Sequence, residues 1–315
     1  MTGRALDYHP FFSNRKVVVL LATLCCLFWG SSYPAIKIGF QLFSIDAGDT
    51  AEKLVFGGWR CFLAGLILLG VAALSKKNIF AMSRSNWAEV GMLGVLQTSL
   101  MFVFFYIGLA HTSGVKGSVL NGTVSFFGVL LAHFIYRNDR LSWAKSLGCL
   151  IGFVGVLVVN FENLDHDLTD FSFTLVGEGC VILSAFFMAA GMIYGKQVSQ
   201  RMDSGLMTGY QLVIGGAVLL IAGYSLGAGL GPLTLRSSSI LGYLVLNSSI
   251  AYTLWSVLLK YNRVGLVSVF NFLVPIFGAI LSALFLGEAF LEWKNLVALA
   301  LVCTGIWLVT LEKSR

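Results

Sequence analysis

Apolar residues along the chain form long runs separated by short polar stretches. Ten windows of about 20 mostly apolar residues can be drawn, which is the length that a helix needs to cross about 30 Å of hydrocarbon. The windows cover roughly residues 17–40, 54–74, 87–109, 114–136, 142–161, 174–196, 207–229, 238–259, 265–286 and 292–311. A membrane β-barrel would instead show short alternating strands. The pattern predicts an all-α integral membrane protein with ten transmembrane helices.

The composition agrees with this pattern. The 315 residues are 57% hydrophobic and only 11% charged, with a mean hydropathy of +0.84, so charges are too few to cover a soluble domain of this size. The net charge is +6, and most of the 21 Lys and Arg residues fall in the two tails and in alternate loops. The positive-inside rule therefore predicts cytoplasmic tails at residues 1–16 and 312–315, and nucleic-acid binding is not expected.

The first apolar run has an alternative interpretation. Arg15 and Lys16, an apolar run and then Gly30-Ser31-Ser32 also resemble a cleavable signal peptide. An internal repeat argues against cleavage, because the first predicted helix has a counterpart in the second half of the chain. The six cysteines all fall in predicted helices, so neither a disulfide framework nor a metal site is expected.

The two halves of the chain resemble each other. Residues 93–158 align with residues 243–308 without a gap, which pairs Asn121 with Asn271. Further upstream, "GGWRCFLAG" aligns with "TGYQLVIGG", and Lys37 aligns with Lys196. Each half holds five predicted helices, and because five is odd the second copy must enter the membrane inverted. The expected units are a five-helix repeat at 17–161, an acidic extracytoplasmic linker at 162–173 and a second five-helix repeat at 174–311.

A stripe of small and polar residues recurs in the fourth and ninth predicted helices. Its members are spaced three or four apart, which puts them on one helical face: Gly114, Ser118, Asn121, Ser125 and Gly128, then Ser268, Asn271, Pro275, Gly278 and Ser282. Such a stripe can serve close helix packing or line a cavity. A buried amide without partners costs a few kcal/mol, so Asn121 and Asn271 favour a shared polar centre. Gln97 and Asn247 lie at equivalent depth in the third and eighth helices.

The order of several loose motifs resembles a known family. They are "WGSSYPAIKIG" in the first helix, P-x-F-x-A at Pro275–Ala279, "LGE" at Leu286–Glu288 and the closing "GIWLV". With the five-helix repeat, the chain resembles the EamA-type branch of the drug/metabolite transporter superfamily. This resemblance implies a central cavity surrounded by helices one, three, four, six, eight and nine, and amino acids or related metabolites as substrates. The first copy departs from the pattern, with Ser125 at the place of Pro275, so we expect the halves to contribute unequally.

The candidate functional residues fall into three groups. Those predicted to bind substrate are Trp29, Ser32, Gln97, Ser118, Asn121, Asn247, Tyr252, Trp255 and Asn271. Three residues that can bend a helix are predicted as conformational hinges, namely Gly30, Pro34 and Pro275. Three cations are predicted to mark the mouths of the pathway, namely Lys37, Arg60 and Lys196. Core packing remains the alternative for the aromatic residues, and snorkelling to the interface remains the alternative for the lysines.

Several chemical signatures are missing from the sequence. No Asp or Glu lies in the middle of a predicted helix, and no phosphate-binding loop, metal cluster or catalytic triad is present. We therefore expect no cofactor and no enzyme activity. The inverted repeat and the family resemblance imply instead a secondary transporter, either an exporter or a facilitator, for a small metabolite such as an amino acid. The mostly uncharged polar residues of the expected cavity suit a zwitterionic or neutral solute. The expected location is the inner (plasma) membrane, and the sequence leaves open whether the protein is a monomer or a homodimer. A membrane-embedded enzyme and a channel or receptor are the alternatives.

Overall fold

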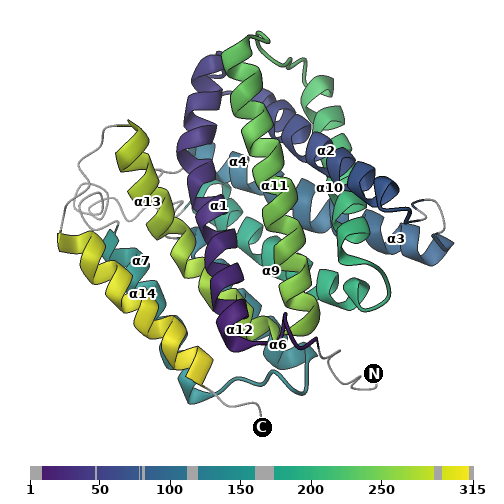
Figure 1. The fold of residues 1–315 in the computed structure, drawn as a ribbon. Coiled ribbons are helices and arrows are strands. Elements are labelled where there is room, and N and C mark those ends of the chain that lie inside the picture. The colour runs from purple at the N-terminus through teal and green to yellow at the C-terminus, as the bar shows by residue number, and fades with distance from the viewer. Residues whose placement is uncertain are drawn as a thin grey trace.

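The computed structural model describes residues 9–46, 48–77, 79, 82–111, 120–159, 174–286 and 293–311, and this part of the chain is helical with no strand (Figure 1). Seven helical segments are long and apolar enough to cross a membrane. They are Arg15–Leu42, Thr50–Leu74, Arg84–Gly108, Leu175–Ser199, Ser204–Ser225, Leu235–Tyr261 and Val264–Ser282. Three shorter apolar helices span Thr123–Ile135, Trp143–Val158 and Leu296–Leu311. The chain is thus an all-α multi-pass membrane protein, and the number of spans stays a prediction.

The first half contains α1 (Arg15–Leu42), α2 (Thr50–Leu74), α3 (Arg84–Leu93), a π-helical stretch η1 (Gly94–Leu100), α4 (Met101–His111), α6 (Thr123–Ile135) and α7 (Trp143–Val159). The second half contains a π-helical stretch η2 (Leu175–Gly179), α9 (Cys180–Ser199), α10 (Ser204–Ser225), α11 (Leu235–Tyr261), α12 (Val264–Ser268), a 3₁₀ segment η3 (Val269–Phe272), α13 (Leu273–Leu286) and α14 (Trp293–Leu311). Several helices begin at a polar cap. The side chains of Asn14, Asp49 and Asp203 each accept a backbone N–H in the first turn of the helix that follows.

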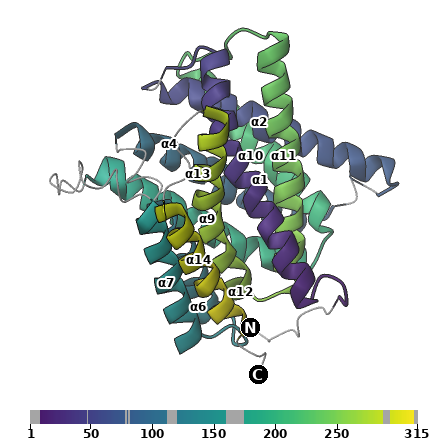
Figure 2. The same cartoon turned by 60° about the vertical axis from the view of Figure 1, so that its left-hand side comes forward.

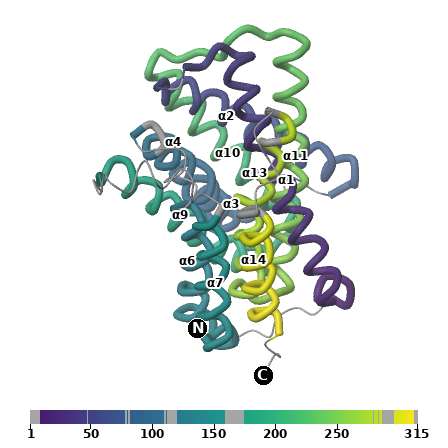
Figure 3. The backbone as a smooth tube through the Cα atoms, turned by 90° about the vertical axis from the view of Figure 1, so that its left-hand side faces the viewer, coloured from purple at the N-terminus to yellow at the C-terminus, as the bar shows by residue number. Residues whose placement is uncertain are grey.

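Helices from the two halves pack against each other in matching pairs. α2 packs along α10 and α7 along α14, while α1 contacts α11 and α13, and α9 contacts α4 and α6 (Figures 1 and 2). Figure 3 shows α7 and α14 side by side. Glycines allow this close approach, since a Cβ atom at Gly305 would lie 2.5 Å from the carbonyl oxygen of Gly148. The contacts of α1 with α11 and α13 thus resemble the contacts of α9 with α4 and α6, with first-half and second-half helices exchanged.

The first and last described helices meet at one end of the molecule, called here the termini end. Arg15 near the start of α1 donates a hydrogen bond of 3.2 Å from Nη2 to Oγ1 of Thr310 near the end of α14. A large apolar cluster that includes Val18, Trp255 and Val264 fills this half of the molecule. A second cluster, which includes Phe43 and Leu54, lies toward the other end, called here the opposite end.

Candidate functional site

A cavity of about 270 Å³ lies between helices of both halves. Its lining residues are Trp29, Ser32, Tyr33, Ile36, Lys37, Phe40, Arg60, Met101, Phe102, Phe105, Tyr106, Asn121, Gly122, Val124, Met188, Tyr252, Asn271, Val274 and Pro275. The residues from α1 all come from its second part, which runs toward the opposite end, and Lys37 is exposed. The cavity therefore reaches the surface on the side away from the termini end.

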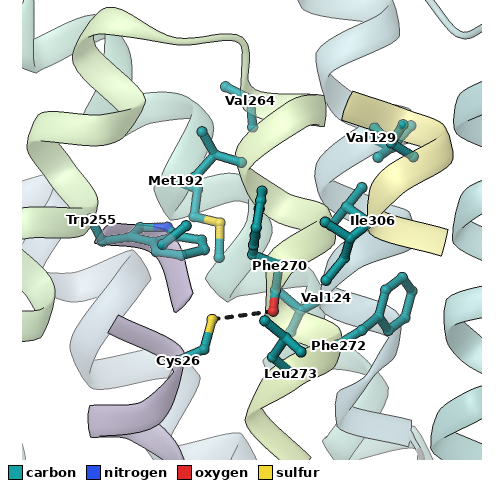
Figure 4. Packing of buried hydrophobic residues seen from close by; sticks show 14 of the residues in the cluster. Cys26, Val124, Val129, Met192, Trp255, Val264, Phe270, Phe272, Leu273 and Ile306 are labelled. Carbon is teal, nitrogen blue, oxygen red and sulfur yellow. Dashed lines mark hydrogen bonds between the residues drawn. The ribbon is translucent and has the colours of Figure 1, made fainter. Parts of the chain in front are cut away.

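Aromatic side chains form one wall of the cavity. The ring of Trp29 packs against Tyr252 at a centroid separation of 5.6 Å and against Trp255 at 4.9 Å. Trp255 is 2% exposed and is absent from the cavity wall, because it lies behind Trp29 among apolar side chains such as Met192 and Phe270 (Figure 4). This packed layer separates the cavity from the termini end.

Three hydrogen-bond donors at or beside the cavity have no partner within the described residues. They are Nε1 of Trp29, Nε1 of Trp255 and Nδ2 of Asn271, each buried from solvent. An unsatisfied buried donor typically costs about 1–3 kcal/mol, so donors that line a cavity favour a ligand with acceptor atoms. Asn121, the repeat partner of Asn271, also lines the cavity and forms a side-chain hydrogen bond with Tyr33.

The backbone near Asn271 departs from regular α-helix. The 3₁₀ segment η3 includes this residue, and α13 begins just after it, with Pro275 in its first turn. Proline is tolerated there because the first-turn N–H groups of a helix have no intrahelical partner. α1, by contrast, is continuous through Gly30 and Pro34. A Cβ atom at Gly30 would lie 2.5 Å from Cβ of Phe277, so this glycine lets α1 and α13 approach closely.

Arg60 on α2 reaches the cavity from within the protein. Its side chain is buried, with the residue 5% exposed, and lines the cavity. Its Nε donates to Oγ of Ser248 at 2.7 Å, and its Nη2 donates to Oγ of Ser32 at 3.3 Å. Ser32 in turn donates to Oδ1 of Asn247 at 3.3 Å. Asn247 therefore supports Ser32 and Arg60 from behind and does not itself line the cavity.

Gln97 lies in a buried pair away from the cavity wall. Its Oε1 accepts a hydrogen bond of 3.1 Å from Nε2 of Gln211. In the repeat alignment Gln97 corresponds to Asn247, and Gln211 corresponds to Arg60. The pair of Gln97 and Gln211 and the group of Asn247 and Arg60 thus occupy related positions in the two halves. The glutamine pair is neutral and its side chains bond to each other, whereas Arg60 places a cation at the cavity.

The structure separates the three cations predicted as pathway mouths. Lys37 and Arg60 line the cavity, whereas Lys196 is buried elsewhere. Nζ of Lys196 donates to the carbonyl oxygen of Leu259 at 2.6 Å and to that of Asn262. Lys196 therefore joins α9 to the C-terminal end of α11. Ser118, also predicted to bind substrate, lies outside the described residues.

A buried ion pair near the termini end was not anticipated. Nζ of Lys145 lies 2.6 Å from Oδ1 of Asp139, and both side chains are almost fully buried. Oδ2 of Asp139 accepts the backbone N–H of Gly265 at 2.8 Å. The loop between α6 and α7 is thereby attached to the start of α12. The sequence signal was the departure of "YRNDRLS" from an "LGE" type turn.

Sequence reasoning also missed the apolar part of the cavity wall. Phe102, Phe105 and Met188 line the cavity, but apolar residues in so apolar a chain carry no individual signal. The repeat alignment does find two of them, because Phe102 corresponds to Tyr252 and Met188 corresponds to Trp29. Related positions of the two halves thus meet at the cavity.

The chain matches one family model and is similar to several known proteins. The family model described as the EamA-like transporter family matches residues 16–161 and 175–311. The chain is 25% identical over 291 residues to a protein of Chlamydia muridarum named S-adenosylmethionine/S-adenosylhomocysteine transporter, covering 89% of this chain and 88% of that protein. It is 25% identical to the uncharacterized transporter YvbV of Bacillus subtilis (93% and 91% covered) and to a chloroplastic WAT1-related protein of Arabidopsis thaliana (91% and 68% covered).

A solved crystal structure shares the fold. Its TM-score is 0.77 at 16% identity, with 95% of this chain and 98% of that chain covered. The match to the family model extends over most of the sequence, and the relatives named above include transporters. The chain belongs to the EamA-like transporter family.

Proposed function

We propose that the protein is a secondary transporter, an exporter or facilitator, that moves a small organic metabolite across the membrane by alternating access. The observation that carries the proposal is the cavity between the two halves. It is lined by repeat-related residues, among them Asn121 and Asn271, and by buried donors that have no partner within the described part of the chain. Substrate sites at the interface of two repeats are common in secondary transporters.

The proposed architecture is ten transmembrane helices in two inverted five-helix repeats, at residues 17–161 and 174–311. The helix contacts support it, because α1 packs on α11 and α13 much as α9 packs on α4 and α6. In this arrangement the three shorter apolar helices complete the ten spans together with the seven longer ones. The repeats then move relative to each other about the cavity.

The proposed location is the plasma membrane, with both termini in the cytoplasm. Basic residues such as Lys77, Arg201 and Lys260 in loops and helix ends on one side support this orientation. The described conformation then has its cavity open to the outside. Its cytoplasmic side is closed by the apolar cluster around Trp255 and by the contacts of Lys196 and Asp139.

The proposed substrate is a metabolite such as an amino acid. The cavity volume of about 270 Å³ suits a small solute, and its wall combines aromatic rings with amide and hydroxyl groups. One relative is named for S-adenosylmethionine and S-adenosylhomocysteine, which both contain an amino-acid portion. Trp29, Ser32, Asn121, Tyr252 and Asn271 are proposed as contacts.

Counterflow in liposomes tests this function. The purified protein is reconstituted, the liposomes are loaded with one unlabelled solute at a time, and entry of the same labelled solute is followed across amino acids, organic acids, nucleosides and sugars. A carrier gives saturable uptake that is accelerated by solute inside, and the solute is recovered unchanged by mass spectrometry. Uptake that neither saturates nor responds to internal solute favours a channel, and a chemically altered solute favours an enzyme. Empty liposomes are the control.

A further inference from the structure

Arg60 is a buried cation for which the described residues supply no anion. It makes two hydrogen bonds, to Ser248 and Ser32, and both partners are neutral hydroxyls. A guanidinium offers five donors in a fixed fork, and these two bonds use only two of them. Burying a charge without a counter-charge has a large free-energy cost, so a buried guanidinium normally has a carboxylate or phosphate partner.

A purely structural role does not require this charge. The related position in the second half is Gln211, whose neutral amide connects two helices through Gln97. Arg60 connects α2 to α1 and α11 through the two serines, which a neutral amide could also do. The difference between the two positions is that Arg60 lines the cavity and Gln211 does not. The charge is thus present at the place where a solute can reach it.

The composition of the cavity wall indicates which kind of anion fits it. The lining residues include two cations, Lys37 and Arg60, and no Asp, Glu or His. A single deep guanidinium matches one carboxylate in bidentate geometry, whereas a multiply charged phosphate ester would call for several buried cations. Most of the remaining wall is aromatic or aliphatic, including Trp29, Phe102 and Tyr252.

We infer that the transported solute carries a carboxylate that binds Arg60, with its apolar or aromatic portion against Trp29 and Tyr252. This inference rests on the proposed transport function and names its substrate class. Ser248 and Ser32 hold the guanidinium fork, and the unpartnered Nδ2 of Asn271 is available to a further acceptor of the solute. An amino acid meets the requirement through its carboxylate, and the amino group is not essential.

Matched probes test the carboxylate without any mutation. Indole-3-acetate, indole-3-acetamide and tryptamine share one aromatic body and differ in carrying a negative, zero or positive charge. Each is titrated as an inhibitor of counterflow of the solute that the panel above identifies. We expect indole-3-acetate to inhibit at least about tenfold more strongly than its amide, since a charged, desolvated hydrogen-bond pair is lost. Equal inhibition by the acid and the amide, or stronger inhibition by the amine, overturns the inference.

Variants assign the effect to Arg60. Arg60→Gln is expected to abolish the preference for the acid over the amide, and Arg60→Lys to retain part of it, because Lys keeps the charge but not the fork. Arg236→Gln is the matched control, since Arg236 is exposed at the start of α11 and does not line the cavity. An unchanged preference in folded Arg60→Gln, judged by its melting temperature in detergent, overturns the inference. If no solute in the panel shows counterflow, the proposed function itself fails, which is a distinct result.

Discussion

At the residue scale, two side chains of the cavity wall have buried hydrogen-bond donors without a partner in the described part of the chain. Asn271 has an unpartnered buried Nδ2, and Trp29 has an unpartnered Nε1 while its ring contacts Tyr252 and Trp255. Such groups contribute little to folding through hydrogen bonds, and an orphaned donor even opposes it. The ring of Trp29 is nevertheless held in place by these neighbouring rings. Buried donors without a protein partner are expected in a site where a ligand supplies the acceptor.

Asn271→Ala should therefore separate stability from transport. Removing an unsatisfied donor leaves the melting temperature in detergent unchanged or slightly higher, whereas loss of a solute contact raises the KM for transport by roughly 5- to 150-fold, equivalent to about 1–3 kcal/mol. Asn121→Ala should also impair transport, but its melting temperature should fall, because Asn121 has a partner in Tyr33. Unchanged transport in both variants would contradict their place in the site.

Trp29→Phe tests the indole N–H apart from the ring. Phenylalanine retains aromatic contact with Tyr252, so the protein should still fold, but this side chain no longer offers a hydrogen-bond donor to the cavity. We expect a several-fold rise in KM with little change in maximal rate. Transport kinetics identical to those of the native protein would mean that the N–H group does not meet the solute.

The sequence identified polar residues of the cavity wall more readily than apolar ones. Asn121 and Asn271 were identifiable because an amide recurs at the same depth in both halves, and both line the cavity. Phe105 and Met188 were not identified, because phenylalanine and methionine are common throughout a membrane protein. Lys196 was expected at a pathway mouth, yet its Nζ is held by backbone carbonyls, a contact set by tertiary packing that no local pattern contains.

At the scale of elements, glycines decide how closely helices pack. A Cβ atom at Gly30 would lie 2.9 Å from the backbone nitrogen of Gly278, and backbone cannot move aside as a side-chain tip can. A Cβ atom at Gly242 on the exposed face of α11 would meet nothing within 4 Å. The two positions have the same residue type in long helices and opposite surroundings.

Gly30→Ala should lower the melting temperature in detergent, with an unfolding free energy smaller by about 1–3 kcal/mol, because α1 must move away from α13. Gly242→Ala is the control and should be neutral or raise stability by up to about 1 kcal/mol, since alanine favours the helix. Equal effects of the two substitutions would contradict the described contact between α1 and α13.

The start of α10 is connected to the segment that follows α2 by a partly exposed ion pair. Lys77 Nζ lies 2.6 Å from Oδ2 of Asp203, whose Oδ1 also accepts the N–H groups of Gly205 and Leu206. Burial opposes ionisation of Asp203, but the hydrogen bonds from Lys77 and the two N–H groups outweigh it and hold the pKa of Asp203 below its usual value. Both side chains are partly exposed, so the contribution is below about 1 kcal/mol.

The sign of the pH dependence follows from the lowered pKa. Stability from the Asp203 charge is fully present above the unfolded-state pKa of about 3.9 and is lost as pH falls through the lower folded-state pKa. Asp203→Asn keeps a helix cap but not the charge, so it should be slightly less stable than the native protein near neutral pH. Melting temperatures measured down to acidic pH should converge. A difference that grows on acidification would contradict this assignment.

At the scale of the whole molecule, the surroundings of the cavity differ between its two ends. Toward the termini end, the cavity is bordered by the packed cluster that includes Trp255, Met192 and Phe270 (Figure 4). The buried pair of Asp139 and Lys145 lies near the same end. Toward the opposite end, Lys37 lines the cavity and is exposed. A transporter that works by alternating access must also adopt a conformation in which the termini end is open and the opposite end is closed.

A cysteine at Phe105, on the cavity wall, measures this arrangement most directly. The six native cysteines, all free thiols, are first replaced, and Phe105→Cys is then labelled with a membrane-impermeant maleimide in sealed vesicles of either orientation. Ser239→Cys, on the exposed surface of α11, is the control for reagent access and is not affected by solute. We expect Phe105→Cys to react from the side opposite the termini and to be protected by a solute that the protein transports. Labelling that is indifferent to a transported solute would contradict the assignment of this cavity as the transport site.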